Sequence, residues 1–346
     1  MPEPTTLERV APLRTITAPP PDIIARAQKY RRPVTMTLKP GDVLGTAVFE
    51  GYRRTHSLEW HHKRSTGIGG SDVAAIVGVS KWTSAYTLWS YRTGAVDRYD
   101  EEQNAAAKRW GQKLERVVME EYAEQHPELV VITWPDGVGA SFRHRDRDYQ
   151  LASPDALLYW PETGEWGILE VKTARYEYDW QDPVLFLPTV PPYYLTQGQW
   201  YVDAFGFTRL EFAVLFSGSK YQEFPVEPDT FEQRVNRDRV VEFLELVETK
   251  TPPSWDGHDS TYETVRRIHP EIDRDTETEL GAEGEYLLDA KRALLAAEAE
   301  WNKARSMVLA EMGRDHHAIW EGRRIASRQS KQGGVPFLAL KIRDLG

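Results

Sequence analysis

The spacing of apolar residues divides the chain into alternating helical and extended segments. The clearest helix is predicted over 104–126, where apolar side chains recur at helical spacing, at Trp110, Leu114, Val117, Val118 and Tyr122. Apolar runs bounded by turn residues predict strands at 129–133, 148–160, 165–174, 209–216 and 220–227. Helical spacing and capping residues predict further helices at 71–79, 84–94, 193–206 and 229–250. This order predicts a mixed α/β fold, with helices flanking a central mixed sheet.

The two ends of the chain differ from this middle part in composition. Residues 1 to about 45 are rich in Pro and Thr without sustained periodicity, which predicts a partly irregular extension. Residues 275–312 are rich in Ala, Leu and Glu and contain no Pro, which predicts one or two long helices. A short hairpin is predicted at 318–330. The predicted parts are an N-terminal extension at 1–50, a core at 51–250 and a helical C-terminal extension at 251–346.

The composition limits the chemistry that the chain can use. Of its 346 residues, 40% are apolar and 28% are charged, as in an ordinary globular protein. There is no cysteine, which excludes disulfides, thiolate metal sites and iron–sulfur clusters and favours a reducing cytoplasm. No apolar run approaches the length of a membrane span, and residues 1–13 lack the apolar core of a signal peptide. We therefore expect a cytoplasmic protein that does not bind membranes.

The net charge of −10 has the wrong sign for a protein that coats nucleic acid with its whole surface. A local basic groove is compatible with this charge, and a cation-dependent nuclease needs carboxylates of its own. The charge therefore argues mildly against a simple DNA-binding module and leaves an enzyme acting on DNA open.

Three charged residues are predicted to converge on neighbouring strands. Side chains alternate between the faces of a strand, so Glu170 and Lys172 project together while Leu169 and Val171 are buried on the other face. Asp155 lies on the preceding strand, which a short turn connects to this one. Two carboxylates and an ammonium so placed can hold a hard cation beside an attacking water.

Each half of this pattern also has a plain structural interpretation. A Glu-x-Lys pair on one strand face is most often a solvated charge pair, and Asp155 after Ser-Pro could simply shape a turn. The combination of Pro-Asp with Glu-x-Lys on the next strand is much more specific than either half.

A glycine-rich turn, RSTGIGGSD, precedes the helix predicted at 71–79. Such a turn lets backbone N–H groups approach an anion, often a phosphate, with Arg64 beside it. The alternative is a tight turn in which Ser71 is an ordinary N-cap. A dinucleotide site is excluded, because the turn follows no clear strand and lacks the spacing G-x-G-x-x-G. The adjacent pairs His61-His62 and His316-His317 lack metal-ligand spacing.

Taken in order, these motifs resemble one known group of nucleases. The turn RSTGIGGSDVAAIVGVS is followed by GQKLE on a helix, then by SPDAL, LEVKTA and YYLTQGQWYV. This order, which extends from about Arg64 to Phe205, resembles the YqaJ-like viral recombinase and phage lambda exonuclease family of the PD-(D/E)XK nuclease superfamily. The resemblance implies a restriction-endonuclease-like core over 51–250.

The resemblance implies a role for each matching residue. Asp155 and Glu170 would bind metal together with Glu115 and the carbonyl of Val171, and Lys172 would orient the water or stabilise the reacting phosphate. Gln197 and Gln199 both match the glutamine motif and are expected among the catalytic residues. From the residues alone, Glu115 could be a surface helix residue and the glutamines the solvent edge of their helix.

For the turn, the resemblance implies a pocket for the 5′-phosphate of a DNA end. Arg64 would supply charge-assisted hydrogen bonds, and Ser71 with the helix N-terminus would donate further ones. Gly69 and Gly70 would let the backbone come close.

The implied activity is metal-dependent 5′-to-3′ degradation of linear duplex DNA ends, with Mg²⁺, as two ions, or Mn²⁺ in its place. It would leave 3′ single strands for an annealing protein in phage recombination, in the cytoplasm of the bacterial host. The resemblance also implies a homo-oligomer, a trimer by analogy. Two alternatives stay open: a structure-specific or single-strand RecB-like nuclease, and a non-catalytic protein that binds DNA ends on a nuclease scaffold.

Overall fold

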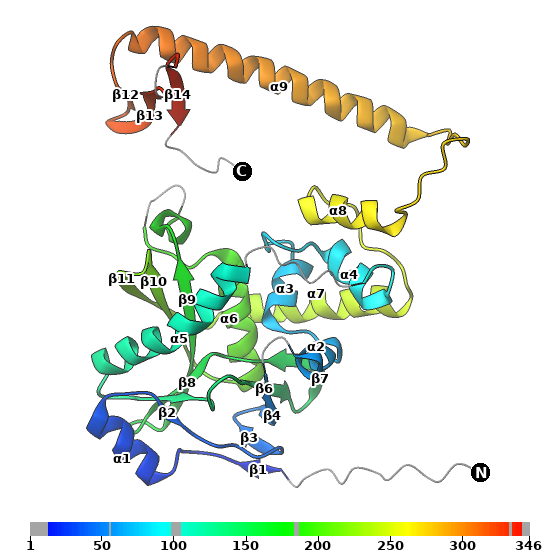
Figure 1. Cartoon of the computed structure of the whole chain (residues 1–346). Helices are drawn as coiled ribbons and strands as arrows, with labels where there is room; N and C mark the ends of the chain where they lie inside the picture. The colour runs from blue at the N-terminus through cyan, green and yellow to red at the C-terminus, as the bar shows by residue number, and fades with distance from the viewer. Residues whose placement is uncertain (1–12, 55–56, 98–104, 183–186, 332–333, 341–346) are drawn as a thin grey trace, which may run out of the picture. The chain divides into compact units, whose positions relative to one another are not determined.

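A computed structural model describes residues 13–54, 57–97, 105–182, 187–331 and 334–340 of the chain. The chain divides into two compact units, Met1–Pro270 and Glu271–Gly346 (Figure 1). The boundary lies beyond the predicted one at 250, because helix α8 (Asp259–Ile268) packs on α4 (Ala85–Thr93) of the first unit. There Thr261 donates a hydrogen bond to the Ser84 hydroxyl at 2.6 Å.

The first unit is built on a six-stranded mixed sheet, in the order β11-β10-β9-β8-β5-β2. Its strands are β2 (Val34–Thr35), β5 (Val130–Thr133), β8 (Ala156–Trp160), β9 (Glu165–Ala174), β10 (Arg209–Phe216) and β11 (Lys220–Val226). β9 pairs antiparallel with β8 and parallel with β10, so the sheet is mixed, as predicted. The mixed α/β fold class is confirmed.

A second sheet of five strands has the order β1-β3-β4-β6-β7. Its strands are β1 (Arg14–Thr15), β3 (Asp42–Leu44), β4 (Ala47–Arg53), β6 (Gly139–His144) and β7 (Arg147–Ala152). Strand β6 was not predicted from the sequence, and its residues include polar side chains at Ser141, Arg143 and His144. The apolar pattern there is too weak to predict a strand.

The structure does not bear out the partly irregular extension predicted at residues 1–50 for the part that it describes. Residues from Arg14 onward supply β1, α1 (Pro21–Tyr30), β2, β3 and β4 to the two sheets and their cover. Phe49 on β4 is buried, and its ring lies 5.3 Å from that of Phe142 on β6. Most of these strands are too short to show the two-residue alternation of buried and exposed side chains. They form strands because they pair with segments that are distant in the sequence.

The strand predicted at 148–160 is in fact two strands in different sheets. β7 ends at Ala152 and β8 begins at Ala156, with Ser153, Pro154 and Asp155 between them. Pro154 has no N–H to donate to a sheet, and its carbonyl accepts a hydrogen bond from Trp134 Nε1 at 2.9 Å. The break places Asp155 at the point where the chain passes from one sheet to the other.

Helices cover both faces of the six-stranded sheet (Figure 1). On one face α5 (Ala105–Gln125) packs Val118, Met119 and Tyr122 against Leu169 and Val171 of β9. The predicted apolar stripe on this helix is only partly right, because Trp110 and Val117 are more than half exposed. On the other face lies α6 (Pro192–Phe205), whose Trp200 is fully buried.

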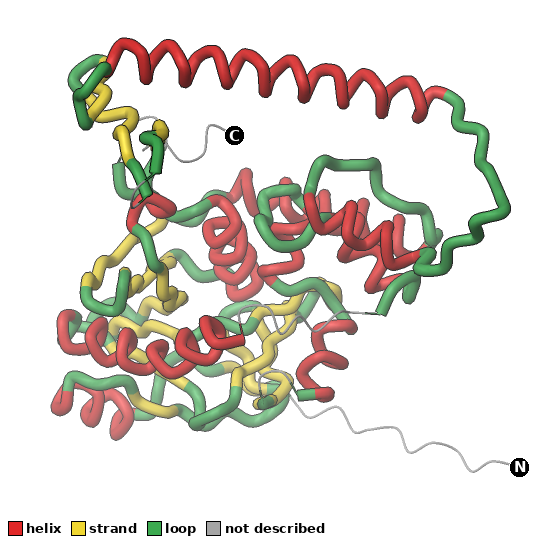
Figure 2. Tube along the Cα trace, turned by 45° about the horizontal axis from the view of Figure 1, so that its top comes forward, coloured by secondary structure: helices red, strands yellow, loops and turns green. Residues whose placement is uncertain are grey.

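The other helices of the first unit are α2 (Leu58–Ser65), α3 (Gly70–Ile76), α7 (Thr230–Glu248) and a 3₁₀ turn at Glu177–Trp180. The tube in Figure 2 shows how these helices and the strands alternate with loops along the chain.

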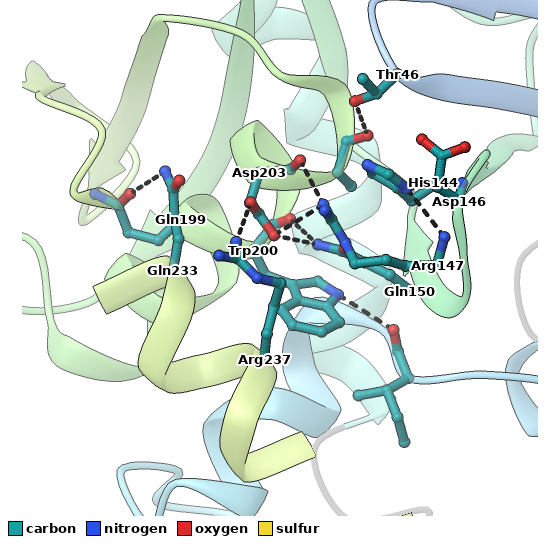
Figure 3. Close-up of polar contacts among 12 residues, drawn as sticks. Thr46, His144, Asp146, Arg147, Gln150, Gln199, Trp200, Asp203, Gln233 and Arg237 are labelled. Atoms are coloured by element: carbon teal, nitrogen blue, oxygen red, sulfur yellow. Dashed lines mark hydrogen bonds and ion pairs between the residues drawn. The ribbon is translucent and has the colours of Figure 1, made fainter. Parts of the chain in front are cut away.

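A buried polar network ties α6 to α7 and β7 (Figure 3). Asp203 of α6 accepts hydrogen bonds from Arg237 of α7 at 2.5 Å, from Gln150 of β7 at 2.9 Å and from Arg147 at 3.2 Å. Two guanidinium groups thus surround one nearly buried carboxylate, which fixes the position of α6 against the second sheet.

The second unit contains one long helix, α9 (Ala282–Met312), and a three-stranded sheet. The sheet consists of β12 (His317–Trp320), β13 (Arg323–Gln329) and β14 (Phe337–Leu340), paired antiparallel. The long helix and the terminal hairpin are therefore confirmed, and β14 adds a third strand. Among the described residues, no helix is both long and apolar enough to span a bilayer.

If residues 14–53 are part of the core, Phe49→Ala will lower the free energy of unfolding by about 3–5 kcal/mol, the usual cost of emptying a buried phenylalanine site. Urea denaturation of the full chain measures this change. The control is Tyr30→Ala on α1, whose side chain is exposed and should change stability by less than about 0.5 kcal/mol. Equal, small effects of both substitutions would mean that this segment is not integrated into the core.

Candidate active site

Asp155, Glu170 and Lys172 meet at the break between β7 and β8. The Lys172 ammonium lies 2.7 Å from Glu170 Oε2 and 3.7 Å from Asp155 Oδ2. The strand pairing explains this placement, because Ala156 lies opposite Leu169 and so brings Asp155 beside the following residues of β9. The backbone N–H of Val171 donates a hydrogen bond to Asp155 Oδ2 at 2.8 Å. Alternation along β9 puts Glu170 and Lys172 on one face, opposite Leu169 and Val171.

The two glutamines of α6 have different surroundings. Gln197 Nε2 donates a hydrogen bond to Glu170 Oε2 at 2.9 Å and so joins the cluster of charged residues. Gln199 instead donates to the carbonyl of Glu227 at 2.9 Å and accepts from the N–H of Asp229 at 2.9 Å. Figure 3 shows its contact with Gln233 of α7. Residues two apart on a helix face different directions, so Gln199 anchors the start of α7 and lies outside the cluster.

Glu115 of α5 lies close enough to Asp155, Glu170 and Lys172 to interact with them electrostatically. Burial and the negative charge of Asp155 raise the pKa of Glu115 to about 8. The same two causes raise the pKa of Glu170 to about 7. Burial would lower the pKa of Lys172, but the carboxylates of Glu170 and Asp155 outweigh it and raise that pKa. The lysine is therefore charged, and it can compensate for only one of the three carboxyl groups when all of them are ionised.

The chemistry of this donor set suits a hard cation. Three carboxyl groups converge here and resist ionising together, and the buried Oε1 of Glu170 has no hydrogen-bond partner. Such oxygens are the ligands that Mg²⁺ and Ca²⁺ prefer. Within the described residues, however, no group of three or more His, Asp or Glu side chains forms a metal site as it stands. At the cluster, the Lys172 ammonium contacts the oxygens of Asp155 and Glu170.

The glycine-rich turn brings Arg64 and Ser71 into contact. Arg64 Nη2 donates a hydrogen bond to Ser71 Oγ at 2.5 Å, and its guanidinium lies 4.7 Å from the centre of the Trp60 ring. Gly70 is required for packing, because a Cβ there would come within 2.7 Å of Gln197 Cγ. Gly69 is the N-cap residue of α3. The turn therefore packs directly on the helix that carries Gln197.

Asp72, which was not predicted as a site residue, organises this turn. Its buried carboxylate accepts hydrogen bonds from Arg64 at 3.2 Å, from Arg92 of α4 at 3.0 Å and from the N–H of Gly69 at 3.4 Å. An acidic residue at the third position of a helix commonly caps it in this way, and that spacing was the available signal. Two arginines around one aspartate leave the turn positively charged.

Members of both groups of predicted residues line one cavity of about 290 Å³, although Glu170, Val171, Lys172 and Gln199 are not among its lining residues. Its predicted lining residues are Arg64, Gly69, Gly70, Ser71, Glu115, Asp155 and Gln197. Its unpredicted lining residues include Trp60, Lys63, Gln112, Ser153 and Tyr201. A basic, hydroxyl-bearing side and an acidic side thus face the same space, which can hold an anionic group between them.

Comparison with known proteins identifies a domain in this part of the chain. Residues 59–207 match the model of the YqaJ-like viral recombinase domain, so the chain contains this domain and the resemblance found from the motifs is confirmed. A similar curated protein is the uncharacterized protein YqaJ of Bacillus subtilis strain 168. It is 28% identical over 229 residues, which are 65% of this chain and 67% of that protein.

Two solved structures are also similar. LHK-Exo in complex with dAMP is 19% identical, with a TM-score of 0.41 over 56% of this chain and 94% of that chain. A structure of the alkaline exonuclease LHK-Exo from Laribacter hongkongensis is 17% identical, with a TM-score of 0.40 over the same shares. The fold class rests on the sheets and helices described above.

The raised pKa of Glu115 predicts how stability depends on pH in the absence of metal. Between pH 4.5 and about 8 the folded state holds a proton that the unfolded state has lost, so raising the pH lowers the free energy of unfolding. Glu115→Gln removes this penalty. In EDTA, its stability relative to the unsubstituted protein will therefore increase from pH 5 to pH 9.

Urea denaturation at both pH values measures the difference between the two proteins. Glu124→Gln, an exposed carboxylate on the same helix, is the matched control and should show no such trend. A difference for Glu115→Gln that is the same at pH 5 and pH 9 would contradict the electrostatic coupling.

Proposed function

We propose, from the YqaJ-like viral recombinase domain at residues 59–207 and its acidic cluster, that this protein is a metal-dependent DNA exonuclease. We further propose that it degrades linear duplex ends in the 5′-to-3′ direction and leaves 3′ single strands for recombination of the phage type. The observation that carries the proposal is the single cavity lined by Arg64 and Ser71 on one side and by Asp155 and Glu115 on the other. A terminal phosphate and a nearby phosphodiester have complementary partners there.

The acidic side of the cavity would cleave the phosphodiester. Glu115, Asp155, Glu170 and the carbonyl of Val171 would hold two Mg²⁺ ions, or Mn²⁺ in their place. When bound, these ions would lower the pKa of a water and neutralise charge on the scissile phosphate. Lys172, charged and 2.7 Å from Glu170, would orient the water and stabilise the negative charge that develops at phosphorus.

Gln197 would act through Glu170. Its amide holds Glu170 Oε2, which leaves Oε1 of the same carboxylate free to turn toward a cation. Gln199 has no part in this step, because its side chain is occupied at the start of α7.

The basic side of the cavity would bind the end of the DNA strand. Arg64 would donate charge-assisted hydrogen bonds to a terminal 5′-phosphate, and the Ser71 hydroxyl would donate another. Trp60 on one side and Asp72 on the other hold the guanidinium in place. Recognition of a 5′-phosphate at one end of the cavity would give the enzyme its direction.

The net charge of −10 restricts DNA binding to local basic surfaces of the chain. We propose that a single-strand annealing protein binds the 3′ single strand that the exonuclease leaves. We also propose that this chain forms a homo-oligomer, with a trimer as the first candidate, and that it acts in the bacterial cytoplasm.

The first test is digestion of linear duplex DNA in Mg²⁺ and in EDTA. The unsubstituted protein should degrade the 5′ strand only in Mg²⁺, and Lys172→Ala should reduce the rate by at least about 100-fold, as loss of a transition-state charge contact does. Blunt, nicked, flapped and single-stranded substrates in parallel distinguish a duplex-end exonuclease from a structure-specific nuclease. An intact duplex end after incubation in Mg²⁺ with the unsubstituted protein would refute the exonuclease.

The two glutamines provide a matched pair of variants. Gln197→Ala should lower kcat, because it removes the hydrogen bond that positions Glu170. Gln199→Ala should lower the free energy of unfolding by about 1–3 kcal/mol, because it leaves buried partners unsatisfied, and should keep kcat. Steady-state kinetics and urea denaturation measure both effects. A fall of kcat in a fully folded Gln199→Ala would show that the roles are assigned to the wrong residue.

The basic side is tested with substrates that carry either a 5′-phosphate or a 5′-hydroxyl. The unsubstituted protein should prefer the phosphorylated end, and Arg64→Ala should lose most of that preference while it keeps Mg²⁺-dependent cleavage. Arg54→Ala, which removes an exposed arginine nearby in the sequence, is the control and should keep the preference. An unchanged preference in Arg64→Ala would exclude the phosphate pocket without excluding a nuclease.

A further inference from the structure

An exposed tryptophan lies close to the proposed catalytic lysine. Trp82, in the loop between α3 and α4, is 54% exposed. Its ring packs edge-on against Tyr193 at 4.8 Å and lies 6.0 Å from the ring of Tyr194, both at the start of α6. Trp180 and Trp200, by contrast, are buried in the core. More than half of a large aromatic side chain is thus exposed to solvent at this point.

A positive charge accompanies this ring. Lys81 Nζ lies 4.8 Å from the centre of the Tyr193 ring and 5.3 Å from that of Trp82. The exposed side chains of Lys81 and Trp82 with the half-buried Tyr193 make up what we call the stacking surface. It is both aromatic and basic, although the chain as a whole is acidic.

The stacking surface is continuous with the active site. Tyr194 lies between the two, because its ring is 5.1 Å from Lys172 Nζ on one side and in contact with Tyr193 and Trp82 on the other. The ring of Tyr194 also stacks on buried Trp180 at 5.5 Å, which fixes it. One aromatic ring therefore separates the stacking surface from the proposed catalytic ammonium.

The loop that carries Trp82 is held in place before any ligand binds. The Ser80 hydroxyl accepts hydrogen bonds from the N–H groups of Trp82 and Thr83, both at 3.2 Å. The Ser80 carbonyl contacts His258 Nε2 at 3.1 Å. A ligand that stacks on Trp82 would therefore not have to order this segment.

An aromatic face with a nearby cation is the arrangement that proteins use for unpaired nucleic-acid bases. Inside a duplex, both faces of a base are covered by its neighbours. Trp82 can stack only with a terminal or unpaired base, and the phosphate of that nucleotide would then lie toward Lys172. A terminal base pair that opens at the duplex end offers such a base.

We propose that the stacking surface binds an unpaired base of the DNA strand whose phosphate enters the active site. This inference rests on the proposed exonuclease function and adds a binding site for a base to it. Stacking on Trp82 stabilises the opened end, and Lys81 binds the adjacent backbone phosphate.

The test measures binding and cleavage separately. The full chain is titrated onto a duplex with two unpaired nucleotides at its 5′-phosphorylated end, one of them 2-aminopurine, in Ca²⁺ and with the DNA checked to be intact. Trp82→Ala should weaken binding about 5- to 100-fold, the usual effect of losing a base–aromatic stack, and should reduce the quenching of 2-aminopurine. Trp82→Phe should restore most of both.

Tyr30→Ala is the matched control, since Tyr30 is also exposed beside a lysine, at 5.2 Å from Lys29 Nζ, but lies on α1. It should bind like the unsubstituted protein. Equal quenching and equal affinity for Trp82→Ala and the unsubstituted protein, while the latter still cleaves DNA in Mg²⁺, would overturn the stacking surface alone. An unsubstituted protein that neither binds nor cleaves this DNA would overturn the proposed function and the stacking surface together.

Discussion

The interaction on which the site depends is the contact of one buried ammonium with two carboxylates. Lys172 lies 2.7 Å from Glu170 and 3.7 Å from Asp155, at the point where the two sheets of the first unit meet. Charges buried at this depth persist only when they are paired. Burial and the negative charge of Asp155 raise the pKa values of Glu115 and Glu170, so these two carboxyl groups resist ionising. The proposed cation would favour the ionised forms of both groups.

The fold holds this cluster rigidly from several sides. The break at Pro154 turns Asp155 toward β9, and the N–H of Val171 fixes its carboxylate. α6 brings Gln197 to Glu170 and is itself held by the paired arginines around Asp203. The turn at Gly70 packs on Gln197, and Gln197 also holds Glu170, so α6 positions both the basic and the acidic side of the cavity. A shift of α6 would move both sides.

Much of the site could be predicted from local patterns. Alternation along 165–174 is enough to put Glu170 and Lys172 on one face, and the Pro-Asp pair marks a strand boundary. The order of motifs was enough to find the YqaJ-like domain. Local patterns failed for 14–53, where the strands are too short to have a period, and for 148–160, where one apolar run serves two sheets. Local patterns also could not show which of Gln197 and Gln199 belongs to the site. Only the position of α7 decides this, because Gln199 is hydrogen-bonded to Asp229 and Gln233 there.

The sequence by itself therefore determined the longer helices and strands, the chemical groups and the YqaJ-like domain, because these depend on spacing over a few residues. Only the tertiary structure decided which groups meet. Arg64 and Ser71 share a cavity with Asp155 and Glu115, and Trp82 contacts Tyr194 beside Lys172, across separations of many residues. These contacts depend on how helices and sheets pack against one another, and packing is set by the shapes of all the buried side chains together.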